Sequence, residues 1–290
     1  MKRSWATLLS WLLWTIVVAD LAVLLISPLL RPRSLGGLEI PTVAAFSLFV
    51  LGFATIGGLI GSRHPRNPIG WIMCVSAIAF TMGGAMGEYA QYSLDERVLP
   101  GFGLSAWFSV WTWSVGASLP PTLLLLLFPD GRPPSWRWRP VAWVTGVAIV
   151  VLTSSIAFEP GKFDDYPTSN PFGVPLIYDA LRPLVGAATI ALLGCAFASI
   201  VSLIFRFRRA ENQERLQLKW LAFAVALVGL AAAISVVIES TADSKDGLIE
   251  LSNLIVTASM STIPIAIGVA VLKHRLYNID RTINRTLVYV

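Results

Sequence analysis

Asp20 is the side chain in this sequence with the clearest potential for chemistry, because it interrupts a long apolar run, Leu8–Leu30. A carboxyl group inside hydrocarbon is costly and usually serves a function, such as binding a proton or a ligand. The same residue can instead stay protonated or hydrogen-bonded and simply orient its helix. No Lys, Arg or His lies near the middle of an apolar run to pair with it, and the sequence leaves both interpretations open.

The other groups that carry chemistry in enzymes do not cluster. The histidines, His64 and His274, each follow the end of an apolar run, and Cys74 and Cys195 lie inside such runs as packing residues. The chain contains no HExxH zinc motif, no GxSxG nucleophile elbow and no GxxxxGK[ST] phosphate loop. We therefore predict no catalytic, cofactor-binding or metal-binding residue, no cofactor, and no enzymatic activity of the chain itself.

Apolar runs of about 19 to 26 residues recur along the chain and define its architecture. Each matches the roughly 20 residues that a helix needs to cross the hydrocarbon core. The runs lie near Leu8–Leu30, Pro41–Gly61, Ile69–Gly87, Ser105–Phe128, Pro140–Phe158, Ala180–Phe205, Trp220–Ile238 and Leu251–Leu272. The predicted fold is all-α: a polytopic transmembrane helical bundle of about eight spans.

The 22 Lys and Arg residues divide unequally between the alternating connectors. The two terminal segments and the second, fourth and sixth connectors hold sixteen: Lys2, Arg3, Arg63, Arg66, Arg132, Arg137, Arg139, Arg206, Arg208, Arg209, Arg215, Lys219, Lys273, Arg275, Arg281 and Arg285. The other connectors hold six: Arg31, Arg33, Arg97, Lys162, Arg182 and Lys245. Because basic loops stay on the cytoplasmic side, this bias predicts that both termini are cytoplasmic.

The composition excludes a soluble fold and a nucleic-acid partner. The chain is 55% hydrophobic and 13% charged, which indicates that its main partner is the lipid bilayer. The net charge of +5 is spread over separate connectors facing anionic headgroups, so no nucleic acid is expected. We predict a multi-pass protein of the bacterial plasma membrane, with residues 1–272 as the transmembrane bundle of eight helices and residues 273–290 as a cytoplasmic juxtamembrane segment.

Two features of the fourth span and its connector are candidate functional elements. Pro120 and Pro121 interrupt the span and form either a hinge or a simple structural kink, since proline removes a backbone hydrogen bond. The connector that follows, Phe-Pro-Asp-Gly-Arg, is a strong turn signal at Asp130. Arg132 and the arginines after it are expected to extend to the lipid surface.

The end of the chain carries a pattern of its own. Leu276, Ile279, Ile283 and Leu287 recur at spacings of three and four, which predicts one apolar face of a helix lying in the interface. Asp280 and Arg281 lie within this stretch and are candidate functional residues. The last residues become apolar, and we interpret them as the start of a further span or output region that the chain does not continue.

Three of the basic segments carry a family resemblance. The runs LFPDGRPPSWRWRPVAW, ENQERLQLKWLAFA and AVLKHRLYNIDRTINRTLVY resemble the multi-pass membrane region of certain bacterial sensor histidine kinases and their kinase-less relatives. The third run is the most specific of the three. In that family further spans follow, and often cytoplasmic GAF and ATP-binding kinase domains. This sequence contains neither a phospho-acceptor histidine in a dimerisation helix nor a glycine-rich ATP lid.

The resemblance implies a sensor in two-component signal transduction that lacks a kinase domain in this chain. Its expected partners are a cytoplasmic kinase or a response regulator, and the chain is expected to form a homodimer. The alternative is a small-molecule transporter or channel. That class usually shows more polar groups at mid-membrane depth than this sequence does.

Overall fold

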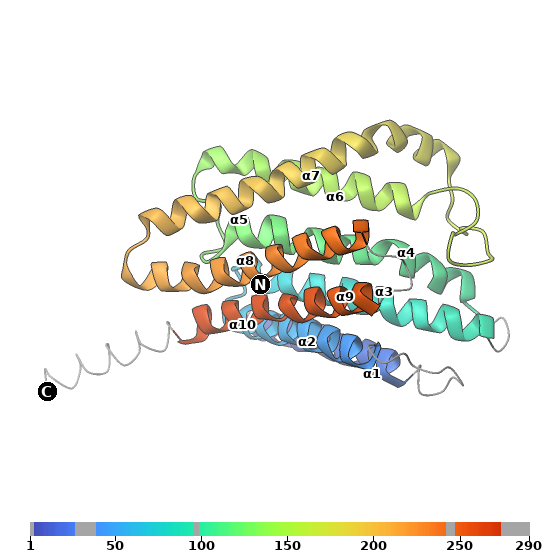
Figure 1. The fold of residues 1–290 in the computed structure, drawn as a ribbon, viewed down its shortest axis with the longest axis horizontal. Helices are drawn as coiled ribbons and strands as arrows, with labels where there is room; N and C mark the ends of the chain where they lie inside the picture. The colour runs from blue at the N-terminus through green and yellow to red at the C-terminus, as the bar shows by residue number, and fades with distance from the viewer. Residues whose placement is uncertain (1–2, 27–38, 96–98, 242–246, 274–290) are drawn as a thin grey trace, which may run out of the picture. The chain divides into compact units, whose positions relative to one another are not determined.

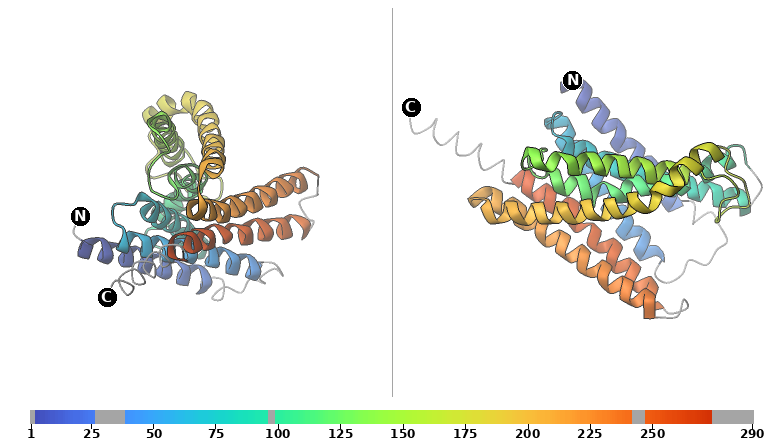
Figure 2. Two further views of the ribbon diagram at one scale, coloured as in Figure 1. Left: turned by 90° about the vertical axis from the view of Figure 1, so that its left-hand side faces the viewer. Right: turned by 90° about the horizontal axis from the view of Figure 1, so that it is seen from above.

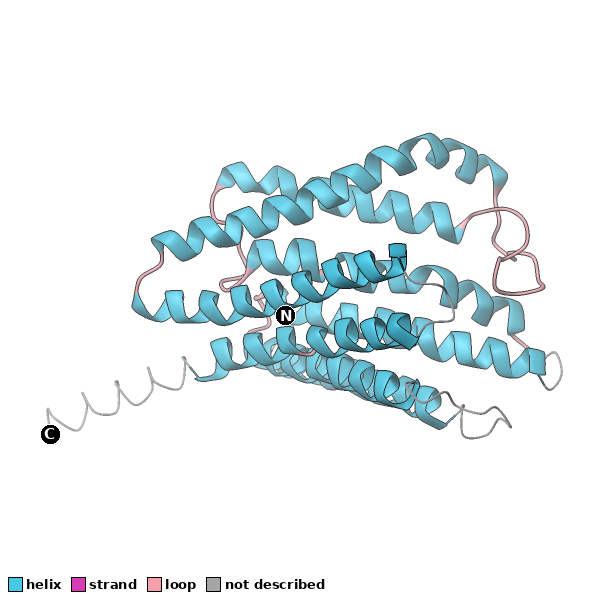
Figure 3. Ribbon diagram, viewed as in Figure 1, coloured by secondary structure: helices cyan, strands magenta, loops and turns pink. Residues whose placement is uncertain are grey.

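The structure is a computed structural model that describes residues 3–26, 39–95, 99–241 and 247–273. These residues form helices joined by loops, with one isolated antiparallel bridge between Lys162 and Ser169 (Figure 3). The helices are α1 (Arg3–Ile26), α2 (Glu39–Arg63), α3 (Pro68–Asp95), α4 (Phe102–Ser118), α5 (Leu125–Leu127), α6 (Arg139–Ala157), α7 (Pro175–Arg209), α8 (Asn212–Thr241), α9 (Gly247–Met260) and α10 (Thr262–Gly268) (Figure 1).

Eight helical segments among the described residues are long and apolar enough to cross a membrane. They are Trp5–Ile26, Ile40–Arg63, Pro68–Leu94, Phe102–Leu127, Trp136–Ala157, Pro175–Arg209, Glu214–Thr241 and Gly247–Val271. The all-helical fold and the eight long apolar helices are thereby confirmed.

Two of these segments contain a π-helical turn. The fourth changes from α4 to a π-helical turn at Pro120–Leu124 before α5, and the eighth combines α9, α10 and a π-helical turn at Val269–Lys273. In both cases a proline lies at or shortly before the change, Pro120 in the fourth segment and Pro264 in the eighth. A proline lacks the amide that an α-helix needs, so the helix rearranges locally.

The chain divides into two compact units, and the first contains residues 1–35 and 53–202. In this unit α3 packs against α1 and α4, and α4 also packs against α6. The second half of α2 approaches α3 closely. A Cβ added to Gly70 would lie 2.7 Å from the Gly61 amide nitrogen and 2.8 Å from the Gly57 carbonyl oxygen. Glycines therefore set the distance between the backbones of α2 and α3.

Helices α6 and α7 of this unit run side by side (Figures 1 and 2). The Cys195 thiol of α7 lies 3.7 Å from the Val141 carbonyl of α6. Both cysteines are buried and free, as packing residues should be.

The second unit contains residues 36–52 and 203–290. Here α8 lies beside α9 (Figure 2), and the hydroxyls of Ser235 and Ser252 join them at 3.2 Å. The Gln217 side-chain amide of α8 donates a hydrogen bond of 3.0 Å to the Ala270 carbonyl in the terminal π-helical turn.

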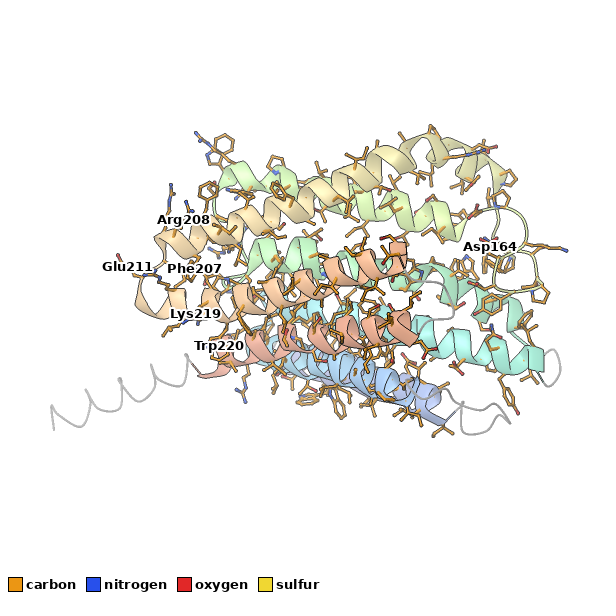
Figure 4. The ribbon with its side chains drawn as sticks, in the orientation of Figure 1. Asp164, Phe207, Arg208, Glu211, Lys219 and Trp220 are labelled. Carbon is orange, nitrogen blue, oxygen red and sulfur yellow. The ribbon has the colours of Figure 1, made fainter. Side chains whose placement is uncertain are left out.

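Charged residues flank the turn between α7 and α8. Figure 4 shows Phe207 and Arg208 at the end of α7 and Glu211 just before α8. The Arg215 guanidinium carbon lies 5.4 Å from the centre of the Phe207 ring, within cation–π distance.

Several helices extend beyond the predicted apolar runs, and two of the differences have a clear physical cause. The connector between the predicted runs Pro140–Phe158 and Ala180–Phe205 is shorter than these runs imply, because Pro175 begins α7, a position where the missing proline amide costs nothing. Helix α3 continues past the predicted end at Gly87 to Asp95. Its last two turns are polar but contain good helix formers. A helix end predicted from hydropathy alone was therefore placed too early.

Candidate functional site

Four of the candidate residues belong to one continuous structural element. We call it the α4 column. Its helical part consists of α4, the π-helical turn and α5. Loop 158–174 packs against the first end of this helical part, and turn 128–132 follows its last residue. Pro120 and Pro121 lie in the π-helical turn, and Asp130 and Arg132 lie in turn 128–132. All of it belongs to the first unit.

Tyr166 fixes loop 158–174 against the first half of α4. Its side chain is 7% exposed and packs edge-on against the Phe102 ring, with 6.3 Å between ring centres. The Tyr166 hydroxyl is hydrogen-bonded to the Ser109 hydroxyl at 3.1 Å. Ala90 of α3 belongs to the same buried cluster, so the loop contacts α3 and α4 together.

Trp107 makes the second contact between the loop and α4. Its indole N–H donates a hydrogen bond of 2.7 Å to the Ala157 carbonyl, and its ring packs on Phe172 with 4.6 Å between centres. Asn170 braces the loop internally: its amide donates to the carbonyls of Ala157 (2.9 Å) and Glu159 (2.8 Å). Its side-chain oxygen accepts from the Phe172 amide at 2.9 Å.

Small residues allow α4 to lie close to α3 along its length. A Cβ on Gly83 would lie 2.6 Å from the Thr112 hydroxyl, and a Cβ on Gly116 would lie 2.8 Å from the Phe80 ring. The two helices therefore meet through complementary small and large side chains. A shift of α4 along α3 would require this packing to be remade.

The helical break follows directly from the two prolines. Pro120 and Pro121 have no amide hydrogen, so the carbonyls of Gly116 and Ala117 lose the donors that an α-helix provides four residues later. The chain widens to a π-helical turn, in which the Leu124 amide donates to the Leu119 carbonyl at 3.1 Å. Such π-helical turns inside α-helices are rare and are frequently found at functional sites.

Ser76 of α3 lies beside this break. The α3–α4 pairing of Phe80 with Gly116 places the next turn of α3, at Ser76, opposite Pro120, and α3 does contact the π-helical turn. Ser76 is fully buried, and its hydroxyl has no hydrogen-bond partner among the described residues.

The turn at the far end of the column is locked to a neighbouring connector. Gly131 has φ +75° and its amide donates to the Leu127 carbonyl at 2.8 Å. A Cβ there would lie 2.5 Å from the Asn67 side-chain oxygen, so only glycine fits. Asn67 in turn accepts a 3.0 Å hydrogen bond from the Ile69 amide at the start of α3. Asp130 and Arg132 are exposed beside this contact.

Asp20 lies outside the α4 column, on the contact between α1 and α3. Its side chain is half-buried and accepts a 3.0 Å hydrogen bond from the Thr81 hydroxyl, and Thr81 is fully buried. This pairing matches the interpretation in which Asp20 orients its helix. It does not bring a second charged group to the carboxyl.

The predicted apolar runs left out several acidic residues that lie inside the candidate spans, and Glu88 is the one nearest the Asp20–Thr81 pair along α3. Glu88 lies in the candidate span Pro68–Leu94 and is partly buried. It follows Thr81 by two helical turns on the same face of α3, about 10 Å along the axis. The apolar run ends at Gly87, so the hydropathy limit excluded Glu88. The helix propensity of the residues after Gly87 would have extended the predicted helix to include Glu88.

Asp280 and Arg281 lie outside the described residues. Within the ranges that the structure covers, no three His, Cys, Asp or Glu side chains are grouped as metal ligands would be. No protein-family model, no curated protein and no solved structure matches the chain.

Proposed function

We propose that the chain is the membrane-embedded input region of a signal-transduction protein, a sensor without catalytic activity of its own. The observation that supports this function is the α4 column. Loop 158–174 holds one end through Trp107 and Tyr166, and turn 128–132 holds the other end against Asn67. The proline break lies between these two contacts and provides a place where the column bends. A stimulus that moves the loop would thus change the turn.

We propose further that the chain lies in the bacterial plasma membrane with both termini in the cytoplasm. The basis is the bias of sixteen basic residues to six between alternate connectors. In this orientation loop 158–174 faces outward and turn 128–132 faces inward. The inner surface then presents the turn to a cytoplasmic kinase or response regulator, and the input region acts as a homodimer.

A coupling experiment tests the sensor proposal. We replace Cys74 and Cys195 by alanine, attach an environment-sensitive fluorophore to a cysteine at position 130, and reconstitute the full chain in bilayers. Asn170→Ala removes three hydrogen bonds of the loop and is expected to change the emission of the distant probe. Adding Pro120→Ala and Pro121→Ala is expected to restore a regular helix and abolish the change.

Lys162→Ala is the matched control, because Lys162 is an exposed residue of the same loop. Hydrogen exchange at residues 160–172 verifies that Asn170→Ala loosens the loop and that Lys162→Ala does not. An impermeant thiol reagent applied to intact cells tests the orientation, with cysteines at positions 164 and 211. A loosened loop with an unchanged probe at position 130 would contradict the proposal.

The transporter alternative is favoured by one observation, the Asp20–Thr81 pair within the α1–α3 contact. The natural test is proton flux in proteoliposomes. We expect no flux above that of protein-free liposomes, because the carboxyl is paired with a single hydroxyl. A transporter would instead show flux that Asp20→Asn abolishes and that Asp165→Asn, in the exposed loop, leaves intact.

The amide in Asp20→Asn still offers an oxygen to Thr81. The unfolding free energy should therefore change by less than about 1 kcal/mol, which keeps a loss of flux interpretable. Flux that is lost in a folded Asp20→Asn protein would replace the sensor proposal with the transporter.

A further inference from the structure

A row of exposed side chains runs along α6 and begins with a charge. Arg139, Trp143, Val147 and Val150 are spaced by four, four and three residues, so they share one face of the helix. All are exposed, with 77% for Trp143, 62% for Val147 and 63% for Val150. In a chain that spans a membrane, this face meets the acyl chains, and Arg139 lies where they end.

The segment before α6 adds an aromatic anchor and a second arginine. Trp136 is 73% exposed, as an indole at headgroup depth would be. The Arg137 guanidinium carbon lies 5.8 Å from the centre of the Trp136 ring. This stacking orders the arginine while leaving its N–H groups available to bind a phosphate in the bidentate manner that guanidinium allows.

More positive charge lies in the turn that precedes this segment and in the connector that contacts that turn. The contact between Gly131 and Asn67 joins the connector 64–67 to turn 128–132. Arg63, Arg66 and Arg132 are all exposed near that contact, and so is one acidic residue, Asp130. These residues, together with Arg137 and Arg139, make five arginines and one carboxylate. An anionic ligand would complement this positive charge.

We propose that Arg137 and Arg139, with Trp136 and the α6 face from Trp143 to Val150, bind an anionic phospholipid. The arginines hold its phosphate, and its acyl chain lies along the α6 face. A phospholipid fits because it joins an anionic group to an apolar chain, as the row on α6 joins Arg139 to Trp143. An acidic protein segment would match the charge and leave the apolar face uncovered. This inference rests on the chain spanning a membrane and is independent of the sensor proposal.

Native mass spectrometry of the full chain in detergent tests the proposal. Phosphatidylglycerol and phosphatidylcholine with identical acyl chains compete for the protein. We expect the wild type to retain phosphatidylglycerol in preference by about tenfold or more, since each arginine contributes about fivefold near a lipid surface. Arg137→Gln with Arg139→Gln should remove most of this preference, and Trp143→Ala should weaken the binding of both lipids.

The control carries the same change of charge at other exposed sites: Lys162→Gln with Arg182→Gln. Thermal unfolding establishes that each variant is folded before lipids are compared. Equal loss of preference in the control would show a general charge effect and overturn the proposal, as would a wild type without preference. Binding of glycerol phosphate as tight as that of the lipid would identify a free-phosphate site instead. Arginine-dependent binding of polyglutamate without lipid preference would point to an acidic protein.

Discussion

Replacing Trp107 by alanine is expected to release loop 158–174 from α4. The change removes the 2.7 Å hydrogen bond to the Ala157 carbonyl and the ring contacts with Phe172 and Trp111. Truncating a large aromatic in a packed site costs about 3–5 kcal/mol, and partial exposure places Trp107 at the lower end. We therefore expect a lower unfolding midpoint in detergent and faster hydrogen exchange at residues 158–174.

Trp113→Ala is the matched comparison, because Trp113 lies on the same helix but is 52% exposed. Removing an indole that faces outward should leave the loop's hydrogen exchange unchanged. If Trp107→Ala and Trp113→Ala affect the loop equally, the contact with Phe172 does not hold the loop in place. The comparison separates loss of an aromatic anchor from loss of a specific contact.

Gly70→Ala is expected to separate α2 from α3. The new methyl group would lie 2.7 Å from the Gly61 amide nitrogen and 2.8 Å from the Gly57 carbonyl oxygen. Both are backbone atoms, so no flexible side chain can move aside. Overpacking of this kind costs about 1–3 kcal/mol, and a rigid backbone contact places the cost at the upper end. The unfolding midpoint in detergent should fall accordingly.

Gly186→Ala is the control for this substitution. Gly186 lies in α7, and a Cβ there would meet nothing within 4 Å. Alanine also favours a helix over glycine, so this variant should match the wild type or exceed its midpoint slightly. A Gly70→Ala protein as stable as Gly186→Ala would show that α2 and α3 are not packed as closely as described.

The sequence alone determined the helical class and the positions of the eight long apolar segments. Both depend on local properties, because length and hydropathy in one window decide whether a helix can span a bilayer. The irregularity at Pro120 and Pro121 was also readable locally, since the missing amides belong to those residues themselves. For the same reason the prediction placed a tight turn at Asp130 and Gly131 correctly, and Gly131 has the positive φ expected there.

Only the tertiary structure decided which of these features belong together. Ser109 and Tyr166 are 57 residues apart, Asp20 and Thr81 are 61 apart, and no periodicity in the sequence marks either pair. The limit of α3 was misplaced because helix formation continues where hydropathy falls, and Glu88 was missed with it. Contacts between distant segments depend on how the helices pack against one another. That packing depends on the shapes of many side chains together, and the pattern of residue types along the chain does not contain this information.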